Sequence, residues 1–221
     1  MVEPLRHYRL LAFDWDGTLA DSTGLIARAL QQACRDLGLP VPCDDAARHV
    51  IGLGHADAIH YLAPNLEPAL HASFSERYSV HYLSGDAAIP LFNGVREMLT
   101  ELVERGFLLG IATGKTRRGL ARALAQHGIA HHFAASRCAD EGFPKPHPDM
   151  LQALMDCAGV EPVHTLMIGD TTHDLALARN ARVDAVAVAY GAHAPEGLAK
   201  MAPLATLHSI AELRAWLTAN G

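Results

Sequence analysis

The stretch Leu10-Leu11-Ala12-Phe13-Asp14-Trp15-Asp16-Gly17-Thr18-Leu19 decides the fold of this chain. Its first four residues are an apolar run bounded by polar residues, which predicts a short buried strand. Asp14 and Asp16 stand one residue apart where that strand ends, and Gly17 lets the backbone turn tightly. Burying two carboxylates side by side is costly unless a metal or a reacting group compensates them. The same residues also favour an ordinary turn before a helix, so both interpretations stay open here.

The composition is that of a globular protein. Half of the 221 residues are apolar and 19% are charged, far from the range of disordered chains. The net charge of −6 argues against nucleic-acid binding, which needs clustered Lys and Arg. No segment approaches the ~18 apolar residues that a membrane helix needs, and residues 1–9 do not resemble a signal peptide. We therefore expect a cytoplasmic protein without nucleic-acid or membrane partners. The sequence leaves open whether it is a monomer or a homodimer.

The cysteines and histidines predict no structural metal site. The four cysteines are widely spread and form no Cys-x-x-Cys pair, so we expect free, mostly buried thiols. None of the 14 histidines falls in a spacing such as His-Glu-x-x-His. Surface or partly buried histidines are the better interpretation.

From about residue 92 onward, apolar runs alternate with segments of helical periodicity. This alternation predicts βαβ units, a parallel sheet and an α/β fold. The predicted strands are residues 10–13, 108–113, 133–136, 165–169 and 184–188, and the predicted helices are residues 116–127, 148–158, 174–181 and 210–217.

Residues 22–86 behave differently, because they show helical periodicity and almost no strand signal. A small helical module is therefore predicted between the first strand and the α/β body. We expect residues 21–86 to form this module, and residues 1–20 with 87–221 to form the core domain.

Two polar clusters follow predicted strands in the middle of the chain. Thr113 and Gly114 can present a hydroxyl donor and a free backbone N–H to an anion, although an ordinary helix cap is the better interpretation of these residues alone. Lys145 stands between two prolines, which leave it little conformational freedom. Such an ammonium group suits the neutralisation of phosphoryl charge, or it is simply solvated in a proline-rich loop.

A third cluster contains Asp170, at the end of a predicted strand, and Asp174 four residues later. Together with the first Asp pair, these oxygen ligands describe a Mg²⁺ site, because Mg²⁺ prefers few carboxylates plus water and phosphate oxygens. The alternative for Asp174 is a favourable charge at a helix N-terminus. Each cluster alone is ambiguous, but all of them occur in order, each after a strand.

These clusters resemble the four motifs of the haloacid dehalogenase-like hydrolases, and the resemblance covers nearly the whole chain. The motif residues are Asp14-x-Asp16-Gly17-Thr18, Thr113, Lys145 and Gly169-Asp170-x-x-x-Asp174. The helical module looks like the cap of the branch that contains phosphoglycolate phosphatases. The resemblance implies a doubly wound, Rossmann-like parallel sheet with a mobile helical cap, and a small phosphorylated metabolite as substrate.

The resemblance also implies a role for each motif residue. Asp14 would be the nucleophile that forms an aspartyl-phosphate, and Asp16 the general acid and base. Thr113 and Lys145 would hold the phosphoryl oxygens. Mg²⁺ would be bound by residues at the ends of two strands, namely Asp14, the Asp16 backbone carbonyl, Asp170 and, directly or through water, Asp174.

Substrate contacts are expected from four further residues: backbone N–H groups near Trp15 and Gly114, His55 in the helical module, and Arg117. Two residues depart from the pattern of relatives. Trp15 replaces a smaller apolar residue and would narrow the mouth of the site, and Arg182 stands where relatives often place Gly.

Several activities share this pattern. Asp16 argues against a dehalogenase, because a departing halide needs no proton. A phosphonate hydrolase would lack this acid and carry a Lys in the cap, and residues 22–86 contain none. A phosphatase is therefore favoured, with a phosphomutase or pyrophosphatase as the main alternatives and a non-catalytic binding protein as a weaker one.

Overall fold

The computed structural model describes residues 8–220, and it contains one parallel sheet of six strands in the order β3-β2-β1-β4-β5-β6. The strands are β1 (Leu10–Phe13), β2 (Leu108–Thr113), β3 (Ala135–Cys138), β4 (Thr165–Gly169), β5 (Asp184–Val188) and β6 (Thr206–Leu207). The strand order reverses between β1 and β4, which is where open α/β sheets form a ligand crevice at the carboxyl ends of their strands. The expected doubly wound fold is confirmed.

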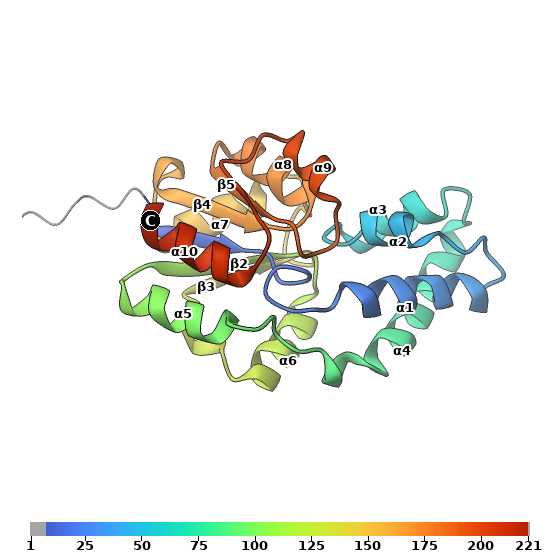
Figure 1. Ribbon diagram of the computed structural model, residues 1–221. Coiled ribbons are helices and arrows are strands. Elements are labelled where there is room, and N and C mark those ends of the chain that lie inside the picture. The colour runs from blue at the N-terminus through green and yellow to red at the C-terminus, as the bar shows by residue number, and fades with distance from the viewer. Residues whose placement is uncertain (1–7, 221) are drawn as a thin grey trace, which may run out of the picture.

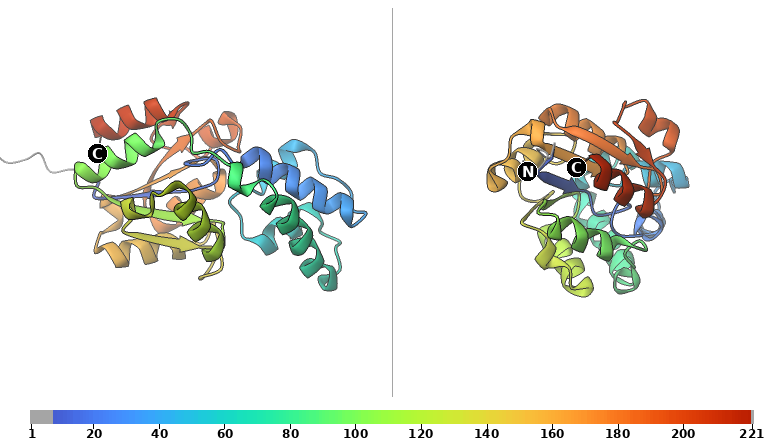
Figure 2. Two further views of the ribbon diagram at one scale, coloured as in Figure 1. Left: turned by 90° about the horizontal axis from the view of Figure 1, so that it is seen from below. Right: turned by 60° about the vertical axis from the view of Figure 1, so that its left-hand side comes forward.

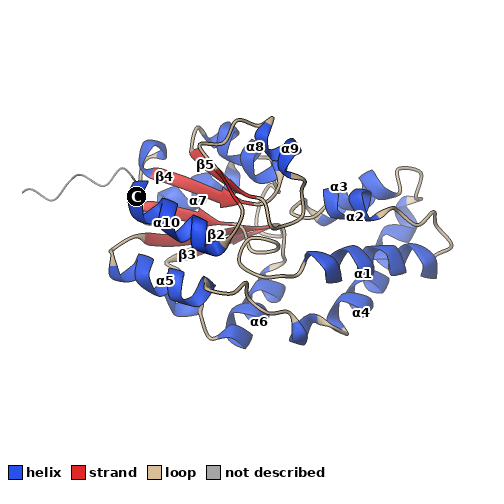
Figure 3. Ribbon diagram, viewed as in Figure 1, coloured by secondary structure: helices blue, strands red, loops and turns tan. Residues whose placement is uncertain are grey.

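Helices cover both faces of the sheet (Figures 1 and 3). One face carries α5 (Val95–Glu104), α6 (Arg117–His127) and α10 (Ile210–Asn220). The opposite face carries α7 (Asp149–Ala158) and α8 (Thr172–Ala181), and α9 (Pro195–Ala199) packs beside α8 and β6. Single 3-10 turns occur at Pro68–Leu70, Asp86–Ala88, Ala130–His132 and Pro162–His164.

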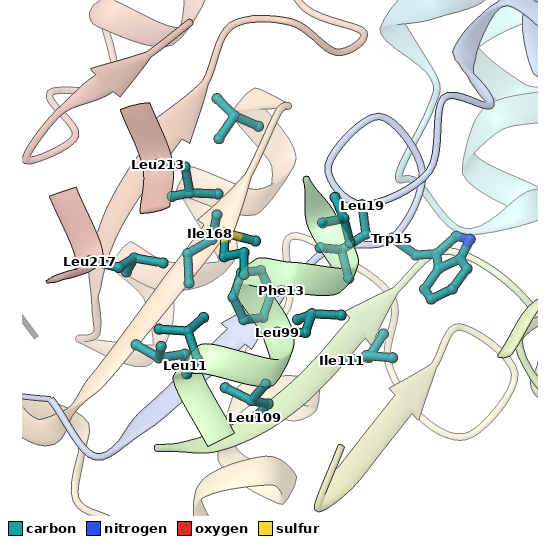
Figure 4. Packing of buried hydrophobic residues seen from close by; sticks show 14 of the residues in the cluster. Leu11, Phe13, Trp15, Leu19, Leu99, Leu109, Ile111, Ile168, Leu213 and Leu217 are labelled. Carbon is teal, nitrogen blue, oxygen red and sulfur yellow. The ribbon is translucent and has the colours of Figure 1, made fainter. Parts of the chain in front are cut away.

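Strand β1 is apolar throughout because both of its faces are buried. Leu11 and Phe13 pack against α5 and α10, whereas Leu10 and Ala12 face α7 and α8. Figure 4 shows the first of these two layers, in which Phe13 lies among side chains from neighbouring strands and helices. A central strand of a parallel sheet is thus a continuous hydrophobic run rather than an alternating one.

The segment between β1 and α5 is helical, with α1 (Thr23–Asp36), α2 (Asp44–His49), α3 (His55–Leu62) and α4 (His71–Leu83). These helices share a hydrophobic cluster, to which α1 contributes Ile26, Ala29, Leu30 and Ala33 at helical spacing. They extend from the carboxyl end of the sheet, as the view from below shows (Figure 2). None of the described helices is long and apolar enough to cross a membrane.

Most predicted elements agree with the structure, and the differences have local causes. Strand β3 lies two residues later than predicted, because its pairing with β2 sets its limits and Phe133 stays outside the strand. Helix α8 begins at Thr172 rather than at Asp174. Helices α5 and α9 and strand β6 are additional to the predicted elements.

All four cysteines are free thiols, as expected. Only Cys34 and Cys138 are buried, however. Cys43 directly precedes α2 and Cys157 lies in the last turn of α7, and both are exposed. The expectation about a signal peptide concerns residues 1–9, most of which lie outside the described residues.

Candidate active site

The two aspartates of the opening stretch lie at the point where the strand order reverses. The backbone N–H of Asp14 donates to the Ile168 carbonyl at 2.9 Å, so the pairing of β1 with β4 continues one residue beyond the strand. The chain then turns at Gly17, whose φ is +85°. A Cβ atom on Gly17 would lie 2.2 Å from Asp170 Oδ2, so this position needs glycine for its backbone conformation and for the close approach of Asp170.

Lys145 bridges two buried carboxylates. Its ammonium group donates to Asp14 Oδ1 at 2.7 Å and to Asp174 Oδ1 at 2.6 Å, and the side chain is fully buried. Burial alone would lower the pKa of Lys145, but the two carboxylates outweigh it and raise that pKa above its ordinary value. Lys145 therefore stays charged and partly compensates the acidic cluster.

Asp14 has two different carboxylate oxygens. Oδ1 accepts the hydrogen bond from Lys145, whereas Oδ2 is buried and has no hydrogen-bond partner among the described residues. Burial raises the pKa of Asp14 to about 7; Lys145 opposes this shift, and the charge of Asp174 adds to it. A buried carboxylate oxygen without a partner is costly unless the site binds another group.

Asp170 and Asp174 are held by short hydrogen bonds. Asp170 accepts from the Thr18 hydroxyl at 2.8 Å and from the Ala192 backbone N–H at 2.6 Å, while burial and the neighbouring carboxylates raise its pKa. Asp174 Oδ2 accepts from the Thr171 N–H and hydroxyl, which completes a capping box at the start of α8. Asp174 thus caps a helix, as one of its two interpretations expects, and also binds Lys145.

Three of these carboxylates are arranged to share a cation. One oxygen each of Asp14, Asp170 and Asp174 lies within 4.8 Å of the others, and all three residues are buried. Hard oxygen ligands of this kind suit Mg²⁺. The unpartnered Asp14 Oδ2 supports this fit, since a cation would satisfy it.

Asp16 points away from this cluster. Its Oδ1 accepts from the Ser22 hydroxyl at 2.6 Å and lies 3.0 Å from Lys115 Nζ. Lys115 also donates to the Tyr82 hydroxyl at 2.7 Å, which ties the core to helix α4. Lys115 and Tyr82 are absent from the predicted site; the one signal for Lys115 was its position directly after Thr113 and Gly114.

The helical module touches the core beside Thr113. Thr113 is buried, and its hydroxyl accepts from the Lys115 N–H at 3.2 Å. A Cβ atom on Gly114 would lie 2.9 Å from the Gly52 carbonyl and 3.0 Å from that of Leu53. Gly114 therefore permits the loop between α2 and α3 to approach the core backbone closely.

The other residues predicted to contact substrate lie in different places. His55 and Asp16 both line a cavity between the helical module and the core, and His55 Nε2 is 2.5 Å from the Ser75 hydroxyl. Trp15 packs its side chain into the core, 1% exposed, so it does not narrow the mouth, and only its backbone is near the site (Figure 4).

Arg117 does not face the cavity. Its guanidinium group binds Glu141 through two nitrogens, at 2.8 and 2.6 Å, and also binds Ser136. The adjacent Arg118 lines the cavity instead. One residue corresponds to a rotation of about 100° around a helix, so Arg118 lies on the cavity side of α6 and Arg117 does not.

Three histidines meet where the helical module contacts the core. His173 and His193 both donate from Nε2 to the His49 carbonyl, at 2.7 and 3.1 Å. The Nδ1 atom of His193 accepts from the Thr172 N–H at 3.1 Å, so both of its ring nitrogens are occupied. One ring nitrogen of each of these histidines lies within 4.8 Å of the others, so the cluster is also a candidate metal-binding group, which the sequence did not predict.

Comparisons with known proteins agree with this geometry. The family described as haloacid dehalogenase-like hydrolase matches residues 11–188. A phosphoglycolate phosphatase of Vibrio vulnificus strain CMCP6 is 34% identical over 216 residues, covering 93% of this chain and 94% of that protein. A probable phosphatase, IndB, of Dickeya dadantii is 32% identical over 211 residues, covering 92% and 91%. A solved putative haloacid dehalogenase-like hydrolase from Bacteroides fragilis superposes with a TM-score of 0.85 at 25% identity, covering 93% of this chain and 99% of its own.

Proposed function

The chain belongs to the haloacid dehalogenase-like hydrolases and is a phosphatase of the branch that contains phosphoglycolate phosphatases, and we propose that it hydrolyses a small phosphate monoester through phosphorylated Asp14. The environment of Asp14 supports this mechanism most directly. Asp14 is fully buried, with one oxygen held by Lys145 and the other without a partner. A carboxylate held in this way is oriented for attack, and its unpartnered oxygen favours a further bound group such as a metal ion.

In the first step, a carboxylate oxygen of Asp14 attacks phosphorus in line. The bond from Asp14 to phosphorus forms while the bond from phosphorus to the leaving oxygen breaks, and Asp16 gives its proton to that oxygen. Asp16 lies outside the acidic cluster, where it can reach a departing group without sharing the nucleophile's position. In the second step, Asp16 takes a proton from the water that attacks phosphorus and releases Asp14.

Thr113 and Lys145 hold the phosphoryl group in this proposal. Both side chains are buried, and Lys145 is already within hydrogen-bonding distance of the nucleophile. Their fixed positions favour stabilisation of the charge that develops on the phosphoryl oxygens, because little reorganisation is needed during the reaction. The backbone N–H groups near Trp15 and Gly114 would add donors to the same oxygens.

We propose that Mg²⁺ is held by Asp14, the Asp16 backbone carbonyl, Asp170 and, directly or through water, Asp174. When bound, the cation offsets the repulsion between an anionic substrate and an anionic nucleophile. The buried, mutually close carboxylates and the unpartnered Asp14 oxygen support this assignment.

We propose further that residues 21–86 form a cap domain that moves relative to the core formed by residues 1–20 and 87–221. The division is supported by a hydrophobic cluster whose buried members all come from residues 21–86 except Ala192. The contact of the Gly52 and Leu53 carbonyls with Gly114 supports a closed position over the site.

A phosphate-release assay tests the proposal. Purified protein with Mg²⁺ should release phosphate from small phosphate monoesters, and EDTA should stop the reaction reversibly. Asp14→Asn should abolish turnover while the circular dichroism spectrum stays unchanged. Full activity of Asp14→Asn would contradict the mechanism, whereas transfer of the phosphoryl group to a sugar instead of water would identify a mutase.

A further inference from the structure

A cavity of about 560 Å³ lies between the helical module and the core. Its walls come from α1, α3 and α4, from the loop between α2 and α3, and from the start of α6; α1 and α4 lie side by side in Figure 1. Of the described residues that line it, Asp16 is the one carboxylate, and Asp14, Asp170 and Asp174 lie outside it. The cavity therefore opens on the acid rather than on the nucleophile.

This position assigns the cavity to the leaving group. The inference rests on the proposed function, in which Asp16 protonates the leaving oxygen. A substrate whose phosphoryl group lies at Asp14 must then direct the rest of its structure past Asp16, into this cavity. The cavity walls thus determine which leaving groups are accepted.

The walls combine apolar surface with polar side chains, of which His55, Ser75, Ser79 and Thr116 are not acidic, Lys or Arg residues. Ile26 and Leu30 of α1 and Val50 after α2 provide aliphatic surface. Tyr78 and Tyr82 of α4 provide an aromatic surface, with their rings stacked 5.7 Å apart between centroids at an interplanar angle of 23°. A polyhydroxylated leaving group would bury the hydroxyls that face the aliphatic part of the wall without partners, which is costly. A flat apolar group gains from the same contacts.

Two of the three cations that line the cavity already have anionic partners. Lys115 already binds Asp16 and the Tyr82 hydroxyl, and Arg122 forms an ion pair with Asp86. Arg118, the remaining cation of the lining, is exposed to solvent. A carboxylate on the leaving group would have to displace one of the existing pairs or remain at the exposed edge.

The volume of the cavity favours a leaving group larger than two carbon atoms. Sites for organic ligands of drug size typically measure about 300–1,000 Å³, and this cavity of about 560 Å³ falls within that range. A leaving group of two carbon atoms would fill a small part of it. We propose that the preferred substrate is a phosphate monoester whose leaving group carries a planar, largely apolar ring that packs against Tyr78.

Turnover of two esters with alkyl leaving groups tests the proposal. Benzyl phosphate carries a planar ring, and 2-phosphoglycolate carries a small anionic group. We expect kcat/KM for benzyl phosphate to exceed that for 2-phosphoglycolate by about tenfold or more, as for loss or gain of one aromatic stacking contact. Tyr78→Ala should lower the ratio of the two kcat/KM values by about tenfold, and Tyr78→Phe should restore it.

A matched control is Tyr61→Ala, because Tyr61 is an exposed cap tyrosine that does not line the cavity. This variant should leave the ratio unchanged. Equal turnover of both esters, a preference for 2-phosphoglycolate, or an unchanged ratio in Tyr78→Ala would each overturn the proposal.

Calorimetric binding to Asp14→Asn separates the inference from the proposed function. Tighter binding of benzyl phosphate than of 2-phosphoglycolate, lost on adding Tyr78→Ala, supports the inference, whereas equal affinities overturn it. If the unaltered protein releases phosphate from neither ester, the proposed function fails, and the calorimetric result still decides what the cavity binds.

Discussion

Replacing Lys145 by Met should destabilise the fold strongly although the two side chains have similar volumes. Lys145 is fully buried and donates to Asp14 and Asp174 at 2.7 and 2.6 Å. Without it, two buried carboxylates lose their shared cation, and breaking a buried ion pair in this way costs about 3–5 kcal/mol. For a chain of this size, each kcal/mol corresponds to about 2–4 °C, so the melting temperature should fall by about 6–20 °C.

Thermal and urea unfolding, followed by circular dichroism without divalent cations, measure this effect. Lys200→Met is the control, because Lys200 is exposed, and it should change the free energy of unfolding by less than about 0.5 kcal/mol. Adding Asp14→Asn to Lys145→Met removes one of the uncompensated charges and should recover at least about 1 kcal/mol. A loss below about 1 kcal/mol in Lys145→Met, or no recovery in the double variant, would refute the electrostatic reasoning.

Three further predictions concern the metal, the cap contact and a strained helix end. Mg²⁺ at 100 times its dissociation constant should stabilise the protein by about 2.7 kcal/mol and raise its melting temperature measurably. Asp170→Asn should abolish this shift in melting temperature, and an equal shift in that variant would show that the cation binds elsewhere. Gly114→Ala places a Cβ atom 2.9 Å from the Gly52 carbonyl. The value of kcat/KM should therefore fall at least about tenfold with an unchanged melting temperature. Unaltered kinetics would argue against cap closure at this contact. Arg182 ends α8 with φ of +58°, so Arg182→Gly should stabilise the fold by about 1 kcal/mol in urea unfolding, and a loss of stability would contradict the strain.

The sequence specified the central strands well because these are buried on both faces. Strands β1, β2, β4 and β5 match their predicted limits, since each is a predominantly apolar run in the interior of the sheet. Strand β3 lies at the edge of the sheet and contains Ser136 and Arg137, so its apolar signal, at Phe133, came two residues too early. Edge strands carry less of the hydrophobic pattern on which prediction depends.

The gathering of Asp14, Lys145, Asp170 and Asp174 was also predictable, because each follows a strand and parallel strands end at one edge. The hydrogen bond between Lys115 and Tyr82 could not be predicted from the sequence, because it depends on how the helical module packs on the core.

The proposed mechanism depends on the phosphorylation of Asp14. Rapid acid quenching of the Mg²⁺-supplemented protein with a substrate labelled in its phosphoryl group, followed by peptide mapping, tests this claim most directly. We expect a label on the peptide that contains Asp14, formed and lost at rates compatible with turnover, and no label in Asp14→Asn. Turnover without a labelled protein intermediate, or a label on another residue, would contradict it.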